Sequence, residues 1–399
     1  MFSFLRELFT PMWVLDWIQV EVTTRCDAAC GYCPRTLWRK AWRDRDMPLE
    51  VFKRLLPDLQ RRWNHPKSVH LQGWGEPLLH PDILTMLDLV KRAGLEAGLT
   101  SNGNRLTQDL ARRLVGSGLD MIAFSLAGTT EPTHAAARPG TSLKRVLTAI
   151  ETVVQARERE GAGPASGPPS GPGVGPASGA ASGMSSGMSS GMSSGAASSV
   201  SSVVDAAGRF PARDTGPGKT PPPAKPAVHV AYMLLRSGLD ELEALPDLLA
   251  DRGVTQVMIT TLDFLPAPHL AAEVFAPDDP DAGDALASRL DAVVERGRER
   301  GLEIAYTVPR PGQGWNWCTE NVGKALVLTV DGEVSPCVFR CLPTDTPIPT
   351  APPRLTFGRL EEGTLRDIWN RPEYAAFRKA FARGTLPTGC EGCVKLRVG

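Results

Sequence analysis

The residues best suited to chemistry are three cysteines within eight positions, Cys26, Cys30 and Cys33. Three thiolates on one short loop can bind three irons of a cubic iron–sulfur cluster, whereas a cluster whose irons all have protein ligands needs a fourth cysteine. The loop contains none, so one iron would stay open to bind and activate a small molecule, as the open position of a catalytic zinc does. An alternating apolar run, 17–24, precedes the loop and predicts a strand that delivers the thiols at its carboxyl end.

The eight cysteines of the chain fall into two groups, which is typical of metal or redox sites and not of a disulfide framework. A structural zinc knuckle, completed by a distant Cys or His, is the alternative for the first group. The second group consists of Cys318, Cys337, Cys341, Cys390 and Cys393.

Length and composition allow one large core and a small second domain, because 399 residues include 42% apolar residues. The 44 basic and 44 acidic residues balance, so charge favours neither a nucleic acid nor an anionic membrane as partner. Residues 1–16 are apolar but interrupted by charges, which predicts a helical segment and not a secretion signal. No apolar run approaches the ~20 residues of a membrane span. We therefore expect a soluble, cytoplasmic protein.

Strands and helices alternate from position 17 to about 300 in six βα units, with 303–308 as a possible extra strand. This alternation predicts an α/β fold with a parallel sheet and outer helices. The expected strands are 17–24, 68–72, 96–100, 120–126, 228–235 and 256–261. The expected helices are 48–63, with a break or kink at Pro57, then 83–93, 108–115, 143–159, 239–251 and 285–300.

A segment rich in Gly, Ser, Pro and Ala, 161–225, interrupts this alternation. It offers too little apolar surface to offset the loss of chain entropy, so we expect a disordered insertion. Because it joins a helix to a strand, it should lie where the strands begin, at the end of the barrel opposite the cysteine loop. The insertion should therefore leave the site open.

The loop spacing Cys-x3-Cys-x2-Cys, with Tyr32 just before the third cysteine, resembles the signature of radical S-adenosylmethionine (SAM) enzymes. The resemblance implies a partial (β/α)6 TIM-like barrel at 17–310. It also implies a 4Fe-4S cluster whose open iron chelates SAM, with Tyr32 near the adenine. In this family an electron from the cluster cleaves SAM to a 5′-deoxyadenosyl radical. A low-potential donor such as ferredoxin or flavodoxin would supply that electron.

A glycine-rich turn follows the second expected strand and contains Gly73, Gly75 and Glu76. Glycines permit close backbone approach, and Glu76 offers an acceptor for an ammonium group. The turn resembles the Gly-Gly-Glu motif that holds the methionyl amino group of SAM, although Trp74 separates the glycines here. A plain tight turn is the alternative.

Three further polar residues lie where related enzymes contact SAM. The resemblance places Asn102 and Ser125 near the ribose; a turn-forming Asn and a hydrogen-bonded Ser are the alternatives. Arg138 begins an Arg-Pro-Gly element that follows the fourth strand in the family, and could pair with the SAM carboxylate. A surface turn is the role that we expect for this arginine.

The last part of the chain, 311–399, has a different pattern. An Asp331-Gly332 turn between apolar segments predicts a hairpin, and 364–383 predicts a helix. The order Cys…Gly-x4-Cys…Cys-x2-Cys resembles the SPASM, or shorter twitch, domains that carry auxiliary clusters on radical SAM barrels. A full SPASM domain uses seven cysteines for two clusters, whereas five are present here. The count supports one auxiliary 4Fe-4S cluster on Cys318, Cys337, Cys390 and Cys393, with Cys341 spare; a zinc ribbon is the alternative.

Together these patterns predict a radical SAM enzyme of the oxidoreductase or maturase type. Its resemblance to enzymes with auxiliary domains implies a peptide, protein or cofactor precursor as substrate. The alternative is a non-catalytic electron-transfer protein with two saturated clusters. Such a carrier would need no SAM and would release no 5′-deoxyadenosine.

Overall fold

The computed structural model describes residues 15–60, 66, 68–161, 225–262, 264–275, 280–307, 317–346, 348–349, 351–391, 393 and 396–397. Its centre is a nine-stranded sheet in the order β10-β9-β1-β2-β3-β4-β5-β6-β7. All neighbours from β1 to β7 run parallel, which confirms the α/β prediction and the extra seventh strand. The strands are β1 (Trp17–Val20), β2 (Ser68–Leu71), β3 (Glu96–Ser101), β4 (Met121–Leu126), β5 (Ala227–Leu234), β6 (Gln256–Thr261) and β7 (Glu303–Thr307), then β9 (Ala325–Leu328) and β10 (Val334–Ser335).

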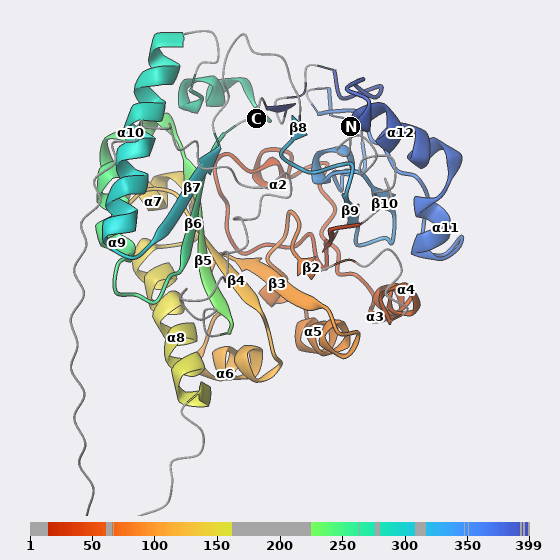
Figure 1. The fold of residues 1–399 in the computed structure, drawn as a ribbon, viewed down its shortest axis with the longest axis horizontal. Coiled ribbons are helices and arrows are strands. Elements are labelled where there is room, and N and C mark those ends of the chain that lie inside the picture. The colour runs from red at the N-terminus through yellow and green to blue at the C-terminus, as the bar shows by residue number, and fades with distance from the viewer. Residues whose placement is uncertain are drawn as a thin grey trace, which may run out of the picture.

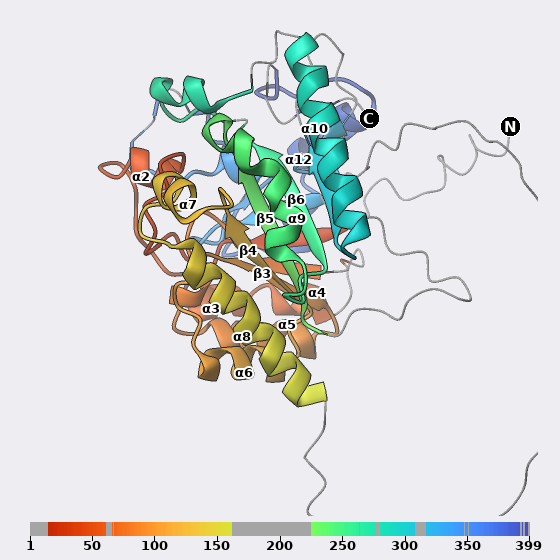
Figure 2. The ribbon, with the colours of Figure 1, turned by 90° about the vertical axis from the view of Figure 1, so that its left-hand side faces the viewer.

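Helices cover the outer face of this curved sheet, and Figure 1 shows α5, α6, α8 and α10 around it. Alternate strand residues, such as Ile18 and Val20 of β1, belong to the main hydrophobic core between sheet and helices. Figure 2 shows α8, α9 and α10 in front of β4 to β6. The helices are α2 (Pro34–Leu37), α3 (Leu49–Lys53), α4 (Leu56–Gln60), α5 (Ile83–Arg92), α6 (Gln108–Gly116), α7 (Glu131–Ala137), α8 (Leu143–Gly161), α9 (Leu245–Leu249), α10 (Pro280–Glu299), α11 (Leu365–Trp369) and α12 (Pro372–Ala382).

Prolines explain where the helices differ from expectation. The expected break near Pro57 is confirmed, because α3 ends at Lys53 and Pro57 lies in the first turn of α4. The single helix expected at 364–383 is wrong: Pro372 lacks a backbone N–H and starts a second helix, α12. The helix expected at 239–251 is a 3-10 helix, η2 (Arg236–Ala244), followed by the short α9.

The C-terminal hairpin continues the barrel's own sheet. Strand β9 pairs parallel with β1, so that Trp17 lies opposite Ala325. Strand β10 returns antiparallel to β9, which confirms the hairpin at Asp331-Gly332. Gly332 has a φ of +76°, a conformation that glycine adopts without strain. The region expected as a separate second unit is therefore joined to the barrel through the edge of β1.

Three predictions fall mainly outside the described residues. They are the N-terminal helix at 1–16, most of the insertion at 161–225, and the start of the C-terminal domain near 311. The described ends of the insertion are Gly161 of α8 and Lys225, just before β5, so it does join a helix to a strand. The domain boundaries stay predictions. Among the described helices, none combines the length and apolar character needed to cross a membrane.

Candidate active site

The cysteine loop lies between β1 and α2, and a second loop holds it in place. Cys30 is 8% exposed, while Cys26 and Cys33 are half-buried. The backbone N–H of Ala29 donates to Pro139 O at 2.7 Å, and Gly31 N donates to Ala137 O at 3.0 Å. The Arg-Pro-Gly element therefore supports the cysteine loop directly through backbone hydrogen bonds.

The glycine-rich turn after β2 packs against the chain that enters the loop. Glu76 N donates to Arg25 O at 2.8 Å. A Cβ at Gly75 would lie 2.7 Å from the same Arg25 oxygen, and one at Gly73 would lie 2.7 Å from Cβ of Glu21. Both positions accept glycine alone without a shift of the neighbouring chain. The glycines thus permit close approach between two segments of this protein; their contact with SAM stays a prediction.

Glu76 joins the turn to the end of β3. Its carboxylate is 3% exposed and accepts hydrogen bonds from Asn102 N at 2.7 Å, Ser101 Oγ at 2.9 Å and Leu78 N at 3.1 Å. Burial raises the pKa of Glu76 to about 7, although these hydrogen bonds act in the opposite direction. A carboxylate has about four acceptor sites, so one remains for a further donor such as an ammonium group.

Asn102 connects β3 to the cysteine loop. Its Nδ2 donates to Asp27 Oδ1 at 2.8 Å and lies 3.7 Å from Cys26 Sγ. Its Oδ1 accepts from Asn104 N at 2.9 Å, which confirms the turn-forming interpretation. Contact with a ribose stays a prediction.

Arg138 and Tyr32 form a buried pair beside the loop. Nη1 of Arg138 donates to the Tyr32 hydroxyl at 2.6 Å, and Arg138 is 8% exposed, so the surface turn expected for this arginine is wrong. Within the described part of the chain, Nε of Arg138 is buried without a hydrogen-bond partner. A buried guanidinium N–H of this kind suits a carboxylate ligand.

Ser125 follows Phe124, which pairs with Ser101 at the end of β3, so Ser125 lies beside the chain that leads into Asn102. It is half-buried on β4, where it alternates with Phe124 and Leu126 of the outer core. The alternation places Ser125 on the inner face of the barrel, beside Ala231 of β5. Its contact with SAM stays a prediction.

The C-terminal cysteines are brought together by a short antiparallel pair. Strand β8 (Trp317–Cys318) pairs with β11 (Leu396–Arg397), so that Cys318 lies opposite Leu396, three residues after Cys393. Cys393 N donates to Cys390 O at 3.1 Å, which closes the tight turn between these two cysteines. Cys337 starts the 3-10 helix η4 (Val338–Arg340).

Residues 20–159 match the family model of the radical SAM superfamily. The chain belongs to the radical SAM superfamily. Residues 318–394 match the model of the SPASM iron-sulfur cluster-binding domain. The two models imply a SAM-binding 4Fe-4S cluster with SAM, and an auxiliary iron–sulfur cluster in the C-terminal region.

Curated relatives match this radical SAM chain over short stretches. It is 30% identical over 114 residues to the tungsten-containing aldehyde ferredoxin oxidoreductase cofactor-modifying protein of Pyrococcus furiosus, covering 28% of this chain and 31% of the relative. It is 35% identical over 112 residues to the PqqA peptide cyclase of Ruegeria pomeroyi, covering 28% of each. The chain thus spans about a third of the length of these relatives.

The similarity to solved structures extends over more of the chain than these sequence matches do. The structure of Streptococcus suis SuiB bound to S-adenosylmethionine covers 92% of this chain and 68% of SuiB, with a TM-score of 0.59 at 13% identity. SuiB bound to the precursor peptide SuiA matches with a TM-score of 0.55 at the same identity, over 92% of this chain and 67% of SuiB. At this identity the likeness shows the fold.

The thiols of the radical SAM loop fit a metal cluster. Burial raises the pKa of Cys26 to about 11 and that of Cys33 to about 12, and the neighbouring thiolate of Cys30 adds to both shifts. Buried thiolates that repel each other need a cationic metal to become stable. In the described ranges no three His, Cys, Asp or Glu side chains surround a single-ion position. The thiolates of a 4Fe-4S cluster each bind a different iron, so they need not converge on the position of a single metal ion.

The auxiliary cysteines fit a cluster in the same way. Burial raises the pKa of Cys318 to about 12, with added repulsion from Glu320, Cys393 and Cys390. Burial also raises the pKa of Cys337, with Glu320 and Cys318 adding to it. Cys318 thus responds to the charges of Cys390 and Cys393, and Cys337 responds to those of Cys318 and Cys341.

Cys341 has different surroundings. It is 2% exposed, and its Sγ donates to Cys337 O at 3.4 Å. Burial raises its pKa, and the largest charge effect on it comes from Glu21 of the barrel, not from a cysteine. The charge of Cys341 also acts on Cys337, and its place outside the ligand set stays a prediction.

Trp74 connects the two sites, a role that no motif of the sequence predicts. Its backbone N–H donates to Glu21 Oε1 at 3.0 Å, and its indole Nε1 donates to Val338 O at 3.3 Å. Its ring lies 5.5 Å from that of Phe339 and 6.4 Å from that of Trp42, both edge to face. The only signal in the sequence was a tryptophan between the two glycines of the turn.

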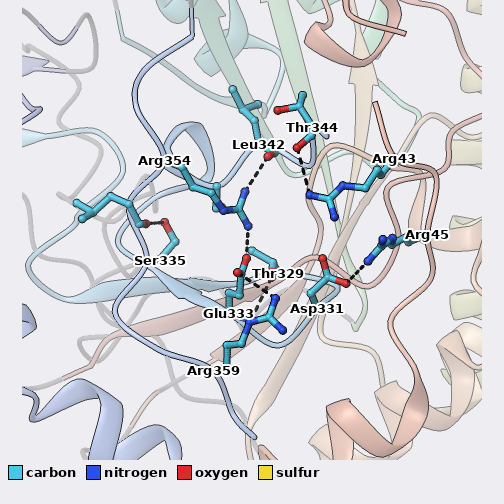
Figure 3. Close-up of polar contacts among 12 residues, drawn as sticks. Arg43, Arg45, Thr329, Asp331, Glu333, Ser335, Leu342, Thr344, Arg354 and Arg359 are labelled. Atoms are coloured by element: carbon cyan, nitrogen blue, oxygen red, sulfur yellow. Dashed lines mark hydrogen bonds and ion pairs between the residues drawn. The ribbon is translucent and has the colours of Figure 1, made fainter. Parts of the chain in front are cut away.

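A polar seam joins the segment after α2 to the C-terminal region, as Figure 3 shows. Arg45 forms an ion pair with Asp331 at 2.8 Å, and Arg43 Nη2 donates to Thr344 O at 3.1 Å. The seam therefore fixes the SPASM hairpin against the chain that follows the cysteine loop.

Proposed function

We propose that the protein is a radical SAM enzyme in which Cys26, Cys30 and Cys33 ligate a 4Fe-4S cluster with one open iron. When bound, the cluster and SAM supply the reductive cleavage that yields a 5′-deoxyadenosyl radical. The observation that carries the proposal is the loop itself: three thiols at the carboxyl end of β1, supported from one side by the Arg-Pro-Gly element and from the other by the glycine-rich turn.

The protein's own residues bind and orient in this scheme. Glu76 accepts a hydrogen bond from the amino group of SAM at the acceptor site left by its three internal donors. Arg138 would offer the carboxylate its Nε, which has no hydrogen-bond partner among the described residues, while its Nη1 holds the Tyr32 hydroxyl and so would position the ring for the adenine. Asn102 holds the loop through Asp27, and Gly73, Gly75 and Ser125 complete the predicted SAM contacts.

For the C-terminal region we propose one auxiliary 4Fe-4S cluster on Cys318, Cys337, Cys390 and Cys393. The short β8–β11 pair and the turn from Cys390 to Cys393 support this set. A cluster there could accept an electron from a substrate radical or return one to it. The electron donor for SAM cleavage would be a low-potential protein such as ferredoxin or flavodoxin.

A peptide or protein is the substrate class we favour, with a cofactor precursor second. The name of PqqA peptide cyclase and the SuiB complex with its precursor peptide support a peptide. The name of the cofactor-modifying protein of P. furiosus supports a cofactor precursor. Because the matches cover less than a third of those curated relatives, the substrate has to be identified by experiment.

Anaerobic reconstitution and SAM cleavage test the proposal. The reconstituted protein should contain two 4Fe-4S clusters, and dithionite with SAM should release 5′-deoxyadenosine. Replacing Cys26, Cys30 and Cys33 by Ala should remove one cluster and all cleavage. Cleavage that survives this change would refute the mechanism, and two clusters without any cleavage would favour the electron-transfer protein.

A further inference from the structure

Arg340 lies in the middle of the auxiliary cysteines. It ends η4, between Cys337 and Cys341 in the chain, and its side chain reaches the segment that precedes Cys390. Only 7% of Arg340 is exposed. Nη1 donates to the carbonyl oxygen of Gly389, so the guanidinium contacts the residue next to a proposed cluster ligand.

The backbone on both sides is shaped for this contact. Gly389 has a φ of +88°, and a Cβ there would lie 2.8 Å from Cζ of Arg340. Only glycine therefore allows the guanidinium to approach so closely. Arg340 N donates to Cys337 O at 3.2 Å, and Arg340 O accepts from Leu355 N at 2.8 Å, which fixes the arginine backbone.

Gly389 is held from both sides, because Arg340 donates to its carbonyl oxygen and the carboxylate of Glu391 accepts from its N–H. In the part of the chain that the structure describes, no carboxylate forms an ion pair with Arg340, and the Nε of Arg340 is buried without a hydrogen-bond partner. The positive charge of Arg340 acts on Cys390. Burial raises the pKa of Cys390 to about 11, and Arg340 opposes that rise. A buried cation that forms no ion pair among the described residues, beside thiols, fits an anionic group such as a thiolate-ligated cluster.

We propose that Arg340 is a positioning and tuning residue of the auxiliary site, whose positive charge raises the reduction potential of the cluster bound there. This inference rests on the proposed auxiliary cluster. On reduction the cluster takes up one electron, from dithionite in the test, and gains one negative charge. Arg340 stays protonated in both states, so it stabilises the reduced form more than the oxidised form without any proton transfer.

Glu320 provides a charge of the opposite sign at the same site. It lies two residues after Cys318, in the turn that Asn321 N closes by donating to Cys318 O at 2.9 Å, and its charge acts on both Cys318 and Cys337. A negative charge there disfavours the reduced cluster. Neutralising Glu320 should therefore change the potential in the direction opposite to neutralising Arg340.

Potentiometric titration followed by electron paramagnetic resonance measures this effect. The full-length protein with Cys26, Cys30 and Cys33 replaced by Ala carries only the auxiliary cluster, and the unmutated protein is titrated in parallel. Arg340→Gln removes the charge but can still donate to Gly389 O, and Arg340→Lys keeps the charge. Arg359→Gln is the matched control, because Arg359 pairs with Glu333 at 3.1 Å and has no hydrogen bond to a cysteine in the described part of the chain.

Arg340→Gln should make reduction about tenfold less favourable, which is about 59 mV for a one-electron couple. Arg340→Lys should restore most of the potential, Glu320→Gln should raise it, and Arg359→Gln should leave it unchanged. An intact cluster with an unchanged potential in Arg340→Gln overturns the role of Arg340 alone. If Arg340→Gln assembles no cluster, the reduction potentials of Arg340→Lys and Glu320→Gln test the proposal instead. A potential in Glu320→Gln that is no higher than in the parent protein overturns the tuning by charge. A wild-type protein without an auxiliary cluster overturns this inference and the proposed auxiliary site together.

Discussion

The indole N–H of Trp74 donates a hydrogen bond to the carbonyl oxygen of Val338 at 3.3 Å. Trp74 lies inside the turn that carries Glu76, and Val338 follows the auxiliary cysteine Cys337 directly. The proposed SAM site and the proposed auxiliary site are therefore in contact through one side chain. A change in either site can bias the other through this contact.

Trp74→Leu should uncouple the two sites. In a protein that retains Trp74, Cys390→Ala removes the auxiliary cluster and should weaken SAM binding. The reason is that the segment with Val338 and Phe339, which contacts Trp74, is then released. The loss of the hydrogen bond to Val338 and of the ring contact with Phe339 amounts to about 1–2 kcal/mol, or about tenfold in the dissociation constant. In the Trp74→Leu background, Cys390→Ala should change SAM affinity by less than twofold.

Equilibrium dialysis of the four proteins completes this double-mutant cycle. Trp38→Leu is the control, because the Trp38 indole donates to Pro266 O, outside the segment that follows Cys337. Additive effects of Trp74→Leu and Cys390→Ala would show that the contact carries no coupling.

The sheet could be predicted from the sequence because its signals are local. Alternating apolar runs and intervening helices appear within short windows, and the boundaries of β6 agree with the expected 256–261. The parallel pairing of β1 with β9 could not be predicted, because Trp17 and Ala325 lie far apart in the chain and no local pattern indicates their register. Arg138 was missed as a buried residue because Arg-Pro-Gly is typical of exposed turns.

Glu76 should make the stability of the cluster-free, SAM-free protein depend on pH. Its pKa is raised from 4.5 to about 7 on folding, so the native state binds more protons than the unfolded state between these values. Stability should therefore fall as pH rises from about 4.5 to 7, by about 3 kcal/mol from this group if its full shift is expressed. Glu21, with a pKa also raised to about 7 by burial, adds a fall in the same window.

Glu76→Gln removes one of the two contributions while keeping size and an acceptor oxygen. Urea unfolding at pH 5 and pH 8 should show that wild-type stability falls more between these two pH values than the stability of Glu76→Gln. The same substitution should weaken SAM binding, because a neutral amide attracts an ammonium group less than a carboxylate does. An equal fall in both proteins would mean that Glu76 titrates normally.

Arg138→Met should weaken SAM binding at least tenfold, because it releases Tyr32 and removes a buried guanidinium whose Nε has no partner among the described residues. Tyr32→Phe loses the hydroxyl that accepts from Arg138 but leaves the cation, so its effect should be smaller. Isothermal titration of the reconstituted proteins with SAM compares the two. Equal losses would mean that Arg138 acts only by holding Tyr32.

The Gly, Ser, Pro and Ala-rich segment should be dispensable for SAM cleavage. Its described ends, Gly161 of α8 and Lys225 before β5, lie at the edge of the sheet opposite the cysteine loop, as expected for a helix-to-strand connection. Replacing residues 163–223 by a short Gly/Ser linker should leave the melting temperature and the yield of 5′-deoxyadenosine unchanged. Loss of either would show that the segment contributes to the fold or to the site.

The last prediction separates the auxiliary ligands from Cys341. The turn from Cys390 to Cys393 and the pairing of β8 with β11 place these two thiols near Cys318, and Cys337 responds to the charge of Cys318. Single Ala substitutions at these four cysteines should therefore lower the iron of the auxiliary cluster and, at saturating SAM, leave SAM cleavage without substrate largely intact.

Cys341→Ala is the matched control, because the thiol donates to Cys337 O and is influenced most by Glu21. Its removal should leave the iron content, the Mössbauer signals of both clusters and SAM cleavage unchanged. Small thermal destabilisation is expected, because Cys341 is buried and the change deletes one packed sulfur atom. If Cys341→Ala loses the auxiliary cluster while one of the other four substitutions retains it, the ligand set is wrong, and the cysteine whose loss is tolerated is the one free to meet substrate.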